Sequence, residues 1–136
     1  MRRLICILTL LLSAKAYSDL AVVVAKDALI DSLSEQQVAN LFLSKTNRFP
    51  HGERAIPIEI KNGALRDGFY QRISGKTSTQ LSSYWATLVF TGKGKPARGY
   101  QNLEELSAQL EAAPGSISYL PDEQVTQNMK VVYHFD

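Results

Sequence analysis

The chain alternates short apolar runs with segments in which apolar residues recur every three or four positions. The runs at residues 20–24, 55–60, 117–120 and 129–135 have the length and composition of β-strands. The first of them, LAVVV, is apolar throughout, as expected for a strand that is covered on both faces. Pro57, in the second run, indicates that this residue lies on an edge strand or at a strand end.

Four segments between these runs carry helix signals. The expected helices begin after a side-chain cap, and the second of them stops at Gly75. The caps are Ser34 with Gln37, Asn62, Thr77 with Gln80, and Asn102 with Glu105. The first helix is expected over residues 35–44, and Pro114-Gly115 ends the last. The side chains expected to face the core are Val38, Leu41 and Phe42; Leu65, Phe69 and Ile73; Leu81, Tyr84, Trp85, Leu88, Val89 and Phe90; Leu103, Leu106 and Leu110; and Tyr119.

Strands that alternate with capped helices predict an α/β fold, with a mostly parallel or mixed sheet and helices on both faces. The chain shows no repeat, low-complexity tract or interdomain linker. Its length suits one domain, which we place at residues 17–136. In such folds ligands bind beyond the carboxyl ends of strands, where loops meet helix N-termini.

The first sixteen residues have the pattern of a secretory signal peptide. A basic start precedes the apolar run 4–12, and Ser13-Ala14-Lys15-Ala16 forms an Ala-x-Ala cleavage site. Apolar residues all round this segment disfavour the alternative, an amphipathic first helix of the fold. We therefore expect cleavage after Ala16 and export to a bacterial periplasm.

Removal of this segment changes the charge and the thiol content of the mature chain. Arg2, Arg3 and Lys15 leave with it, so 15 basic residues become 12 against 13 acidic ones, a net charge of −1. A basic patch for nucleic acid is therefore not indicated. Cys6 also leaves, which excludes a disulfide, a thiolate metal site and a cysteine nucleophile in residues 17–136.

The corner between the strand at 55–60 and the following helix is the candidate ligand site. The first turn of a helix has backbone N–H groups without intrahelical partners and a partial positive charge, which together favour an anion. An arginine there can add a two-point clamp for phosphate or carboxylate. The expected binding residues are Lys61, Asn62, Gly63, Ala64, Leu65 and Arg66. In the alternative interpretation Asn62 only caps the helix, and Arg66 is solvated or paired with Asp67.

Enzyme and metal motifs receive no support from the sequence. Gly75-Lys76-Thr77 lacks the earlier glycine that a phosphate-binding P-loop needs, because position 70 is Tyr70. His51 with Glu53 is too few ligands for a closed metal site, and His134 lies in an ordinary strand pattern. We therefore expect a protein that is not an enzyme and that uses no cofactor.

A basic, glycine-rich segment follows the third helix. In FTGKGKPARGY, Lys93 and Lys95 are close to Arg98, as in a solvated loop. The other interpretation is a second contact to an anion or to a partner protein.

The order of four motifs resembles a known family. SLSEQQVANLFLSKTNRFPHGERAIPIEI, GALRDGFYQRISGK, YWATLVFTGKG and APGSISYLP resemble small, single-lobe members of the phosphate-transporter substrate-binding protein family, within the type II periplasmic binding protein superfamily. The resemblance covers residues 20–132. It implies binding of phosphate or a similar oxyanion for an ABC importer, held by helix N-termini, hydroxyls and an arginine. The matching motifs add Lys45, Ser118 and Tyr119, with Lys93, as secondary site residues.

The chain departs from the family pattern in ways that leave two functions open. It has room for one lobe, and Asn62-Gly63-Ala64 stands where the family has Ser-Gly-Thr, so two hydroxyl donors are missing. The first hypothesis is an exported oxyanion-binding protein, completed by a homodimer or acting with an ABC importer. The second is a periplasmic interaction or regulatory module that uses one lobe to contact a membrane protein and binds no small molecule.

Overall fold

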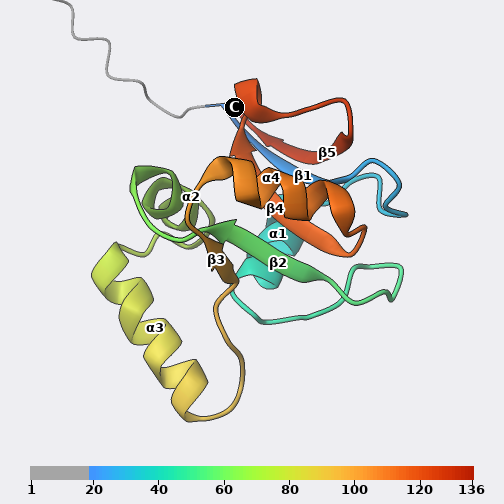
Figure 1. The fold of residues 1–136 in the computed structure, drawn as a ribbon. Coiled ribbons are helices and arrows are strands. Elements are labelled where there is room, and N and C mark those ends of the chain that lie inside the picture. The colour runs from blue at the N-terminus through green and yellow to red at the C-terminus, as the bar shows by residue number, and fades with distance from the viewer. Residues whose placement is uncertain (1–18) are drawn as a thin grey trace, which may run out of the picture.

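The computed structural model describes residues 19–136, so the expected signal peptide at residues 1–16 lies outside the described part. Five strands and four α-helices follow one another along the chain (Figure 1). The strands are β1 (Leu20–Ala25), β2 (Ile56–Ile60), β3 (Arg98–Tyr100), β4 (Ser116–Pro121) and β5 (Met129–Phe135). The helices are α1 (Glu35–Phe42), α2 (Ala64–Ser74), α3 (Ser78–Phe90), α4 (Leu103–Ala112) and a short 3-10 turn, η1 (Asp122–Gln124).

The strands form one mixed sheet in the order β3-β2-β4-β1-β5. Strand β2 is parallel to β3 and β4, whereas β1 is antiparallel to β4 and β5. All six residues of β1 are buried, which agrees with the uninterrupted apolar run that predicted it. The α/β prediction is confirmed, in its mixed-sheet form.

Helices cover both faces of the sheet, as predicted. On one face α4 packs Leu106 and Leu110 against a cluster that includes Val23 and Leu120. On the other face α1 and α2 bury a larger cluster with β1 and β4. Helix α3 packs outside this layer, through Leu81 and Trp85, and extends away from the sheet in Figure 1. Strand β2 ends at Ile60 and α2 begins at Ala64, so the start of α2 lies at the carboxyl end of β2.

The predicted caps of α1, α3 and α4 are confirmed. Ser34 and Thr77 form complete capping boxes, and the side chain of Asn102 accepts a hydrogen bond from the Glu105 N–H at 2.9 Å. Helix α2 ends at Gly75, which has the left-handed conformation expected of a C-cap.

Several expectations about element boundaries and packing were wrong. Helix α1 ends at Phe42 rather than Ser44, because Ser44 has a φ of 59° and turns the chain out of the helix. Val89 and Phe90 do not join the core; Phe90 is 91% exposed because it points away from the face that carries Leu81 and Trp85. Strand β3 was not predicted, since three residues with a glycine at the centre carry too little pattern.

Pro57 lies near the start of an interior strand. It pairs with Ile117 of β4 in the register of the sheet, and the β2–β3 pairing begins only at the next residue, Ile58. A proline without an N–H donor is tolerated there because the strand has a neighbour on one side only at that point. The strand-end interpretation is thus the correct one.

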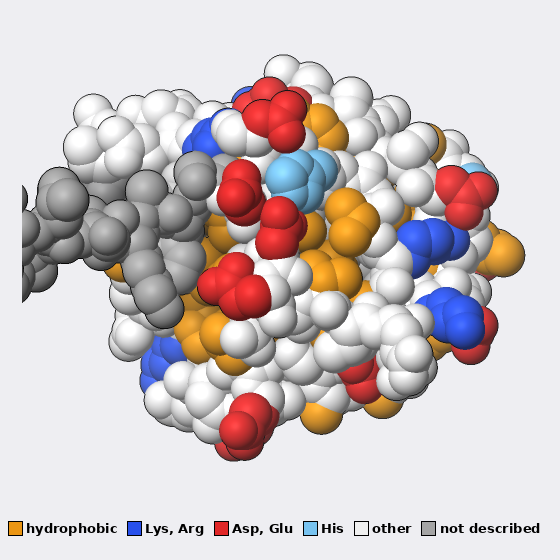
Figure 2. All heavy atoms as spheres, turned by 90° about the horizontal axis from the view of Figure 1, so that it is seen from above, with side chains coloured by type: hydrophobic (Ala, Val, Ile, Leu, Met, Phe, Trp, Pro, Cys, Tyr) orange, Lys and Arg blue, Asp and Glu red, His pale blue; other side chains and the backbone are white. Residues whose placement is uncertain are grey.

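The C-terminal end of β5 is tied to η1 by an ion pair. His134 Nε2 lies 2.7 Å from a carboxylate oxygen of Asp122, and His134 Nδ1 lies 3.3 Å from Asp136. Figure 2 shows acidic side chains gathered around a histidine on the face seen from above. The hydrogen bond with Asp122 raises the pKa of His134, with a smaller contribution of the same sign from Asp136 and an opposing effect of burial.

We expect this pair to make stability depend on pH near neutrality. A histidine whose pKa is raised on folding contributes stability that is fully present below its ordinary pKa of 6.5 and is lost as the pH rises through the raised value. Thermal melts of the wild type and His134→Gln between about pH 6 and about pH 9 should show a decline in Tm that is smaller in the variant. His51→Gln, which leaves this pair intact, should keep the wild-type decline. An equal decline in all three proteins would contradict the assignment.

Within the described part of the chain, each helix is too short or too polar to serve as a membrane span.

Candidate functional site

The turn from β2 into α2 places a backbone N-terminus at the carboxyl end of a parallel strand. Gly63 is the N-cap, with φ 111° and ψ −177°, a conformation that is open essentially to glycine alone. Asn62 was expected to cap this helix, and that expectation is wrong: the sharp turn at Gly63 moves Asn62 one position out of the helix. Among the residues that the structure describes, no side chain takes over the role.

This makes α2 different from the other three α-helices. Each of those has a serine, threonine or asparagine whose oxygen accepts a hydrogen bond from the first turn. The first turn of α2 has no such internal acceptor, and Asn62, Gly63 and Ala64 are exposed. Its N–H groups and the positive end of its dipole are therefore open to an anion from solution.

Arg66 is anchored beneath this turn by a buried carboxylate. Its Nε donates a hydrogen bond to Glu59 Oε2 at 2.8 Å. The other oxygen, Oε1, accepts hydrogen bonds from the hydroxyls of Tyr70 at 2.5 Å and Tyr119 at 3.4 Å. The guanidinium also lies over the Tyr70 ring, 4.9 Å from its centre. Glu59 is thus held by three donors, which is the arrangement that a buried carboxylate requires.

Burial acts differently on the two members of the ion pair. The Glu59 residue is 2% exposed, and burial raises the pKa of its carboxyl although the hydrogen bonds from Tyr70 and Arg66 and the charge of Arg66 oppose the rise. The Arg66 side chain is 19% exposed; burial lowers its pKa, but its pairing with Glu59 outweighs this and leaves the pKa raised. The difference follows from position, because Glu59 lies in the core and Arg66 reaches its surface.

The arrangement can orient the arginine toward an external anion. A guanidinium has five N–H donors in a fixed plane, and the contact with Glu59 uses the one on Nε. A side chain in the first turn of a helix leans back toward the N-terminus. The donors on the terminal nitrogens of Arg66 form no hydrogen bond within residues 19–136, so they remain for a ligand.

The sequence did not identify Glu59 or Tyr70 as part of this corner, and the predicted alternative partner, Asp67, is not the one that Arg66 uses. Two signals were available. A glutamate inside the apolar run AIPIEI needs a donor when that strand is buried. Arg66 and Tyr70 are four residues apart, so they share one face of α2.

The remaining predicted site residues are Lys61, Leu65, Ser118 and Tyr119, together with Lys45 and Lys93, which lie elsewhere. Lys61 is exposed at the end of β2, beside the corner, and its N–H donates to the carbonyl of Tyr100 at 2.8 Å. Leu65 is largely buried. Tyr119 and Ser118 are completely buried, and the Ser118 hydroxyl has no hydrogen-bond partner in residues 19–136. By contrast, Lys45 and Lys93 line one hollow away from this corner, near the amino ends of β2 and β3.

A metal site is not formed by the described residues. No group of three histidine, cysteine or acidic side chains comes together in residues 19–136. His51 Nε2 lies 3.4 Å from Glu53, as an exposed pair within a turn.

Comparisons with known proteins identify the fold. No protein-family model and no curated protein matches the chain. Among solved structures, an ABC-type phosphate transport receptor from Vibrio cholerae superposes with a TM-score of 0.65 at 10% identity, over 85% of this chain and 46% of the other. The chain has a periplasmic-binding-protein fold.

Two further structures give the same result. A candidate phosphate ABC transporter substrate-binding protein with bound phosphate, from Clostridium perfringens, matches with a TM-score of 0.63 at 12% identity, over 85% of this chain and 45% of the other. A possible phosphate binding protein from Planctomyces limnophilus matches with a TM-score of 0.61 at 13% identity, over 85% and 42%. The chain spans less than half the length of these proteins, which fits a single lobe of the fold.

Proposed function

We propose that this chain is an exported, non-enzymatic solute-binding protein that binds phosphate or a related oxyanion at the start of α2. The observation that supports the proposal most directly is the uncapped first turn of α2 above an arginine held by Glu59. The fold is that of proteins described as phosphate receptors, and one of them carries bound phosphate. The signal-like segment at residues 1–16 supports export to the periplasm.

The geometry indicates what the ligand contacts would be. The N–H groups of Ala64 and Leu65 would donate to one side of the anion, and Arg66 to another. Lys61 adds a second positive charge nearby. At longer range the negative charge of Glu59 cancels the positive charge of Arg66. The affinity for the anion therefore depends on short, directed hydrogen bonds more than on the net charge of the site.

An isolated lobe leaves one side of such an anion in water. Exposed charge pairs contribute only about 0–1 kcal/mol each, so we expect weak binding by the lobe alone. A second copy of the chain, or a membrane protein such as an ABC importer, would strengthen binding if it excluded water from the open side.

Arg66→Lys should weaken phosphate binding about tenfold while the fold is retained, since lysine keeps the charge beside Glu59 but loses the planar fork of donors. Isothermal titration of residues 17–136 with phosphate, sulfate and acetate tests this, with Arg72→Lys on the same helix as the matched control. Lysine is preferred to alanine here because alanine would leave Glu59 buried without its charged partner. Phosphate affinity that is equal in the wild type and Arg66→Lys would contradict the proposed site.

The second candidate function is a periplasmic interaction or regulatory module that binds no small molecule. It is favoured by the pairing of Arg66 with Glu59, which makes the arginine part of the core network. Absence of both heat and thermal shift with all three anions would support this function and contradict the first.

A further inference from the structure

Two adjoining hollows lie near the amino ends of β2 and β3, whereas α2 starts at the carboxyl end of β2. One has a volume of about 460 Å³ and the other about 530 Å³. They share residues of the turn after α1, the residue Arg54 before β2, and Lys95 before β3. We call the two hollows together the rear groove; their common lining is Ser44, Thr46, Asn47, Arg54 and Lys95.

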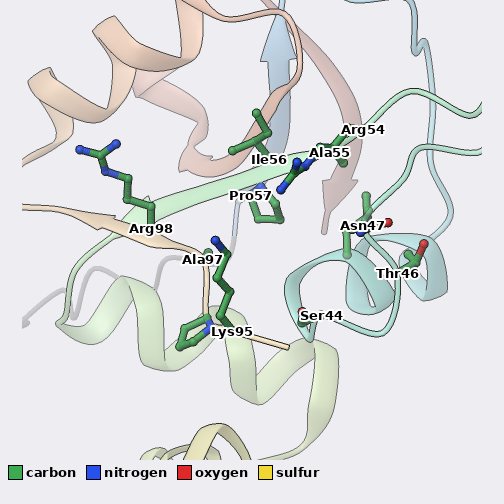
Figure 3. A pocket seen from close by; sticks show the side chains of 12 residues that line it. Ser44, Thr46, Asn47, Arg54, Ala55, Ile56, Pro57, Lys95, Ala97 and Arg98 are labelled. Atoms are coloured by element: carbon green, nitrogen blue, oxygen red, sulfur yellow. The ribbon is translucent and has the colours of Figure 1, made fainter. Parts of the chain in front are cut away.

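Among residues 19–136, the rear groove is lined by cations and by no carboxylate. Lys45 and Lys93 line the more open hollow, and Arg54 and Lys95 line both. Figure 3 shows Arg54 and Lys95 extending toward Pro57 from two sides, whereas Arg98 points away. Among the lysines and arginines of residues 19–136, Arg66 and Lys130 form ion pairs with carboxylates, whereas these four cations form none.

The fold brings these cations together by specific backbone geometry. Ser44 has a φ of 59°, the one non-glycine residue with positive φ among those described, and it turns Lys45 back toward the groove. A Cβ on Gly94 would lie 2.6 Å from Ser44 Oγ, so only glycine lets the segment with Lys93 and Lys95 approach this closely. The positive charges of Lys93 and Lys95 repel that of Lys45 when the two segments pack together, and a bound anion would offset this repulsion.

The more enclosed hollow supplies an apolar floor beside these charges. Leu41, Ala55, Pro57 and Ala97 line it, and Ile56 is left 48% exposed. An apolar side chain exposed next to clustered cations suits a ligand that has both characters. An inorganic anion would use the cations and leave the apolar floor wet.

We propose that the rear groove binds an amphiphilic anion, with a phosphate or carboxylate group among the cations and an apolar body on the floor formed by Leu41, Ile56 and Pro57. The anionic group lies in the open hollow near Lys45 and Lys93, and Arg54 and Lys95 contact it at the junction. Such a ligand is either a free organic anion or the headgroup region of an anionic lipid. The proposal does not depend on the oxyanion site at α2, which lies at the carboxyl end of β2 rather than at its amino end.

Hexyl phosphate is the probe that tests this, compared with inorganic phosphate and hexanol. We expect hexyl phosphate to bind with a Kd at least about tenfold lower than either, because it alone fills both hollows. In amide NMR spectra the signals of Ser44, Asn47 and Gly94 should shift with hexyl phosphate. The double variant Arg54→Gln/Lys95→Gln should weaken binding roughly tenfold and should melt no lower than the wild type, since these exposed cations have no ion pair to lose.

Two controls separate this groove from the α2 site. Lys26→Gln changes an exposed cation that lines a different hollow, beside Glu111 and Asn128, and should leave hexyl phosphate binding unchanged. Arg66→Lys should leave the hexyl phosphate shifts of Ser44, Asn47 and Gly94 unchanged, although it weakens the binding of inorganic phosphate if the proposed function is correct. Vesicles with phosphatidylglycerol identify the source: co-sedimentation that is lost in the double variant indicates a lipid, and binding of hexyl phosphate alone indicates a free anion.

Equal affinities for hexyl phosphate, inorganic phosphate and hexanol would overturn the proposal. So would hexyl phosphate binding that is unchanged in Arg54→Gln/Lys95→Gln, or NMR shifts confined to the start of α2.

Discussion

Phe69→Ala is expected to lower the free energy of unfolding by about 3–5 kcal/mol, the usual cost of removing a buried aromatic ring. Phe69 is completely buried at the centre of an aromatic cluster. Its ring stacks on Tyr119, with 3.7 Å between ring centres, and meets Phe42 edge-on at 4.9 Å. The variant loses these contacts and leaves a cavity between α2 and the sheet that rigid strands cannot fill.

Chemical denaturation followed by tryptophan fluorescence measures this loss, because Trp85 is the chain's one tryptophan. Phe90→Ala is the matched control: it removes the same ring from a position that is 91% exposed and should change stability by no more than about 0.5 kcal/mol. Equal effects of the two substitutions would contradict the burial of Phe69 and the exposure of Phe90.

Glu59→Ala is expected to cost about 3–5 kcal/mol, because it removes one partner of a buried ion pair. Arg66 loses its carboxylate, and the hydroxyls of Tyr70 and Tyr119 lose their acceptor within the core. Unpaired polar groups at buried positions carry the full cost of their lost hydration. The Tm should therefore fall by roughly 10 °C or more in a domain of this size.

A double-mutant cycle shows whether the pair is the cause. Glu59→Ala combined with Arg66→Ala should cost less than the sum of the two single variants, by at least about 1 kcal/mol, since the second substitution removes a charge that has already lost its partner. Glu123→Ala, at an exposed position in η1, should be nearly neutral. Strict additivity of the two single variants would contradict a direct contact between Glu59 and Arg66.

The buried pair has a consequence for ligand binding. A free arginine at the start of α2 would have to be ordered when the anion arrives, which costs side-chain entropy. Glu59 removes that cost in advance because it holds Nε in place. Glu59 also reduces the net positive charge of the site. The pair therefore attracts a distant anion less strongly but holds the Arg66 donors in a fixed position.

The two ends of the parallel strands β2 and β3 therefore differ in chemistry. At their carboxyl ends one arginine is neutralised from below by Glu59, and the open donors are the backbone groups of α2. At their amino ends, several cations gather around an apolar floor without any internal counter-charge in the described chain. Experiments with a single anion would therefore report on whichever end is stronger, which is why variants at both ends are needed.

Local signals were enough to predict most of the elements. Ser34, Thr77 and Asn102 start their helices because their side chains bond to the next turn, and this depends on residues only three positions away. The run LAVVV became a central strand because it is apolar on both faces. Strand β3 lacked any such signal and exists because β2 offers it a parallel edge.

By itself, the sequence determined the α/β class, three of the helix starts, the end of α2 at Gly75 and the corner that carries Gly63 and Arg66, since each depends on residues that are near neighbours along the chain. Tertiary structure alone decided that Arg66 pairs with Glu59 under the hydroxyl of Tyr119, sixty positions from that glutamate. It also decided that Lys45 and Lys93 line the same hollow of the rear groove, because Gly94 packs on Ser44. Such pairings depend on which surfaces the folded sheet and helices bring together, and no local period or spacing encodes that.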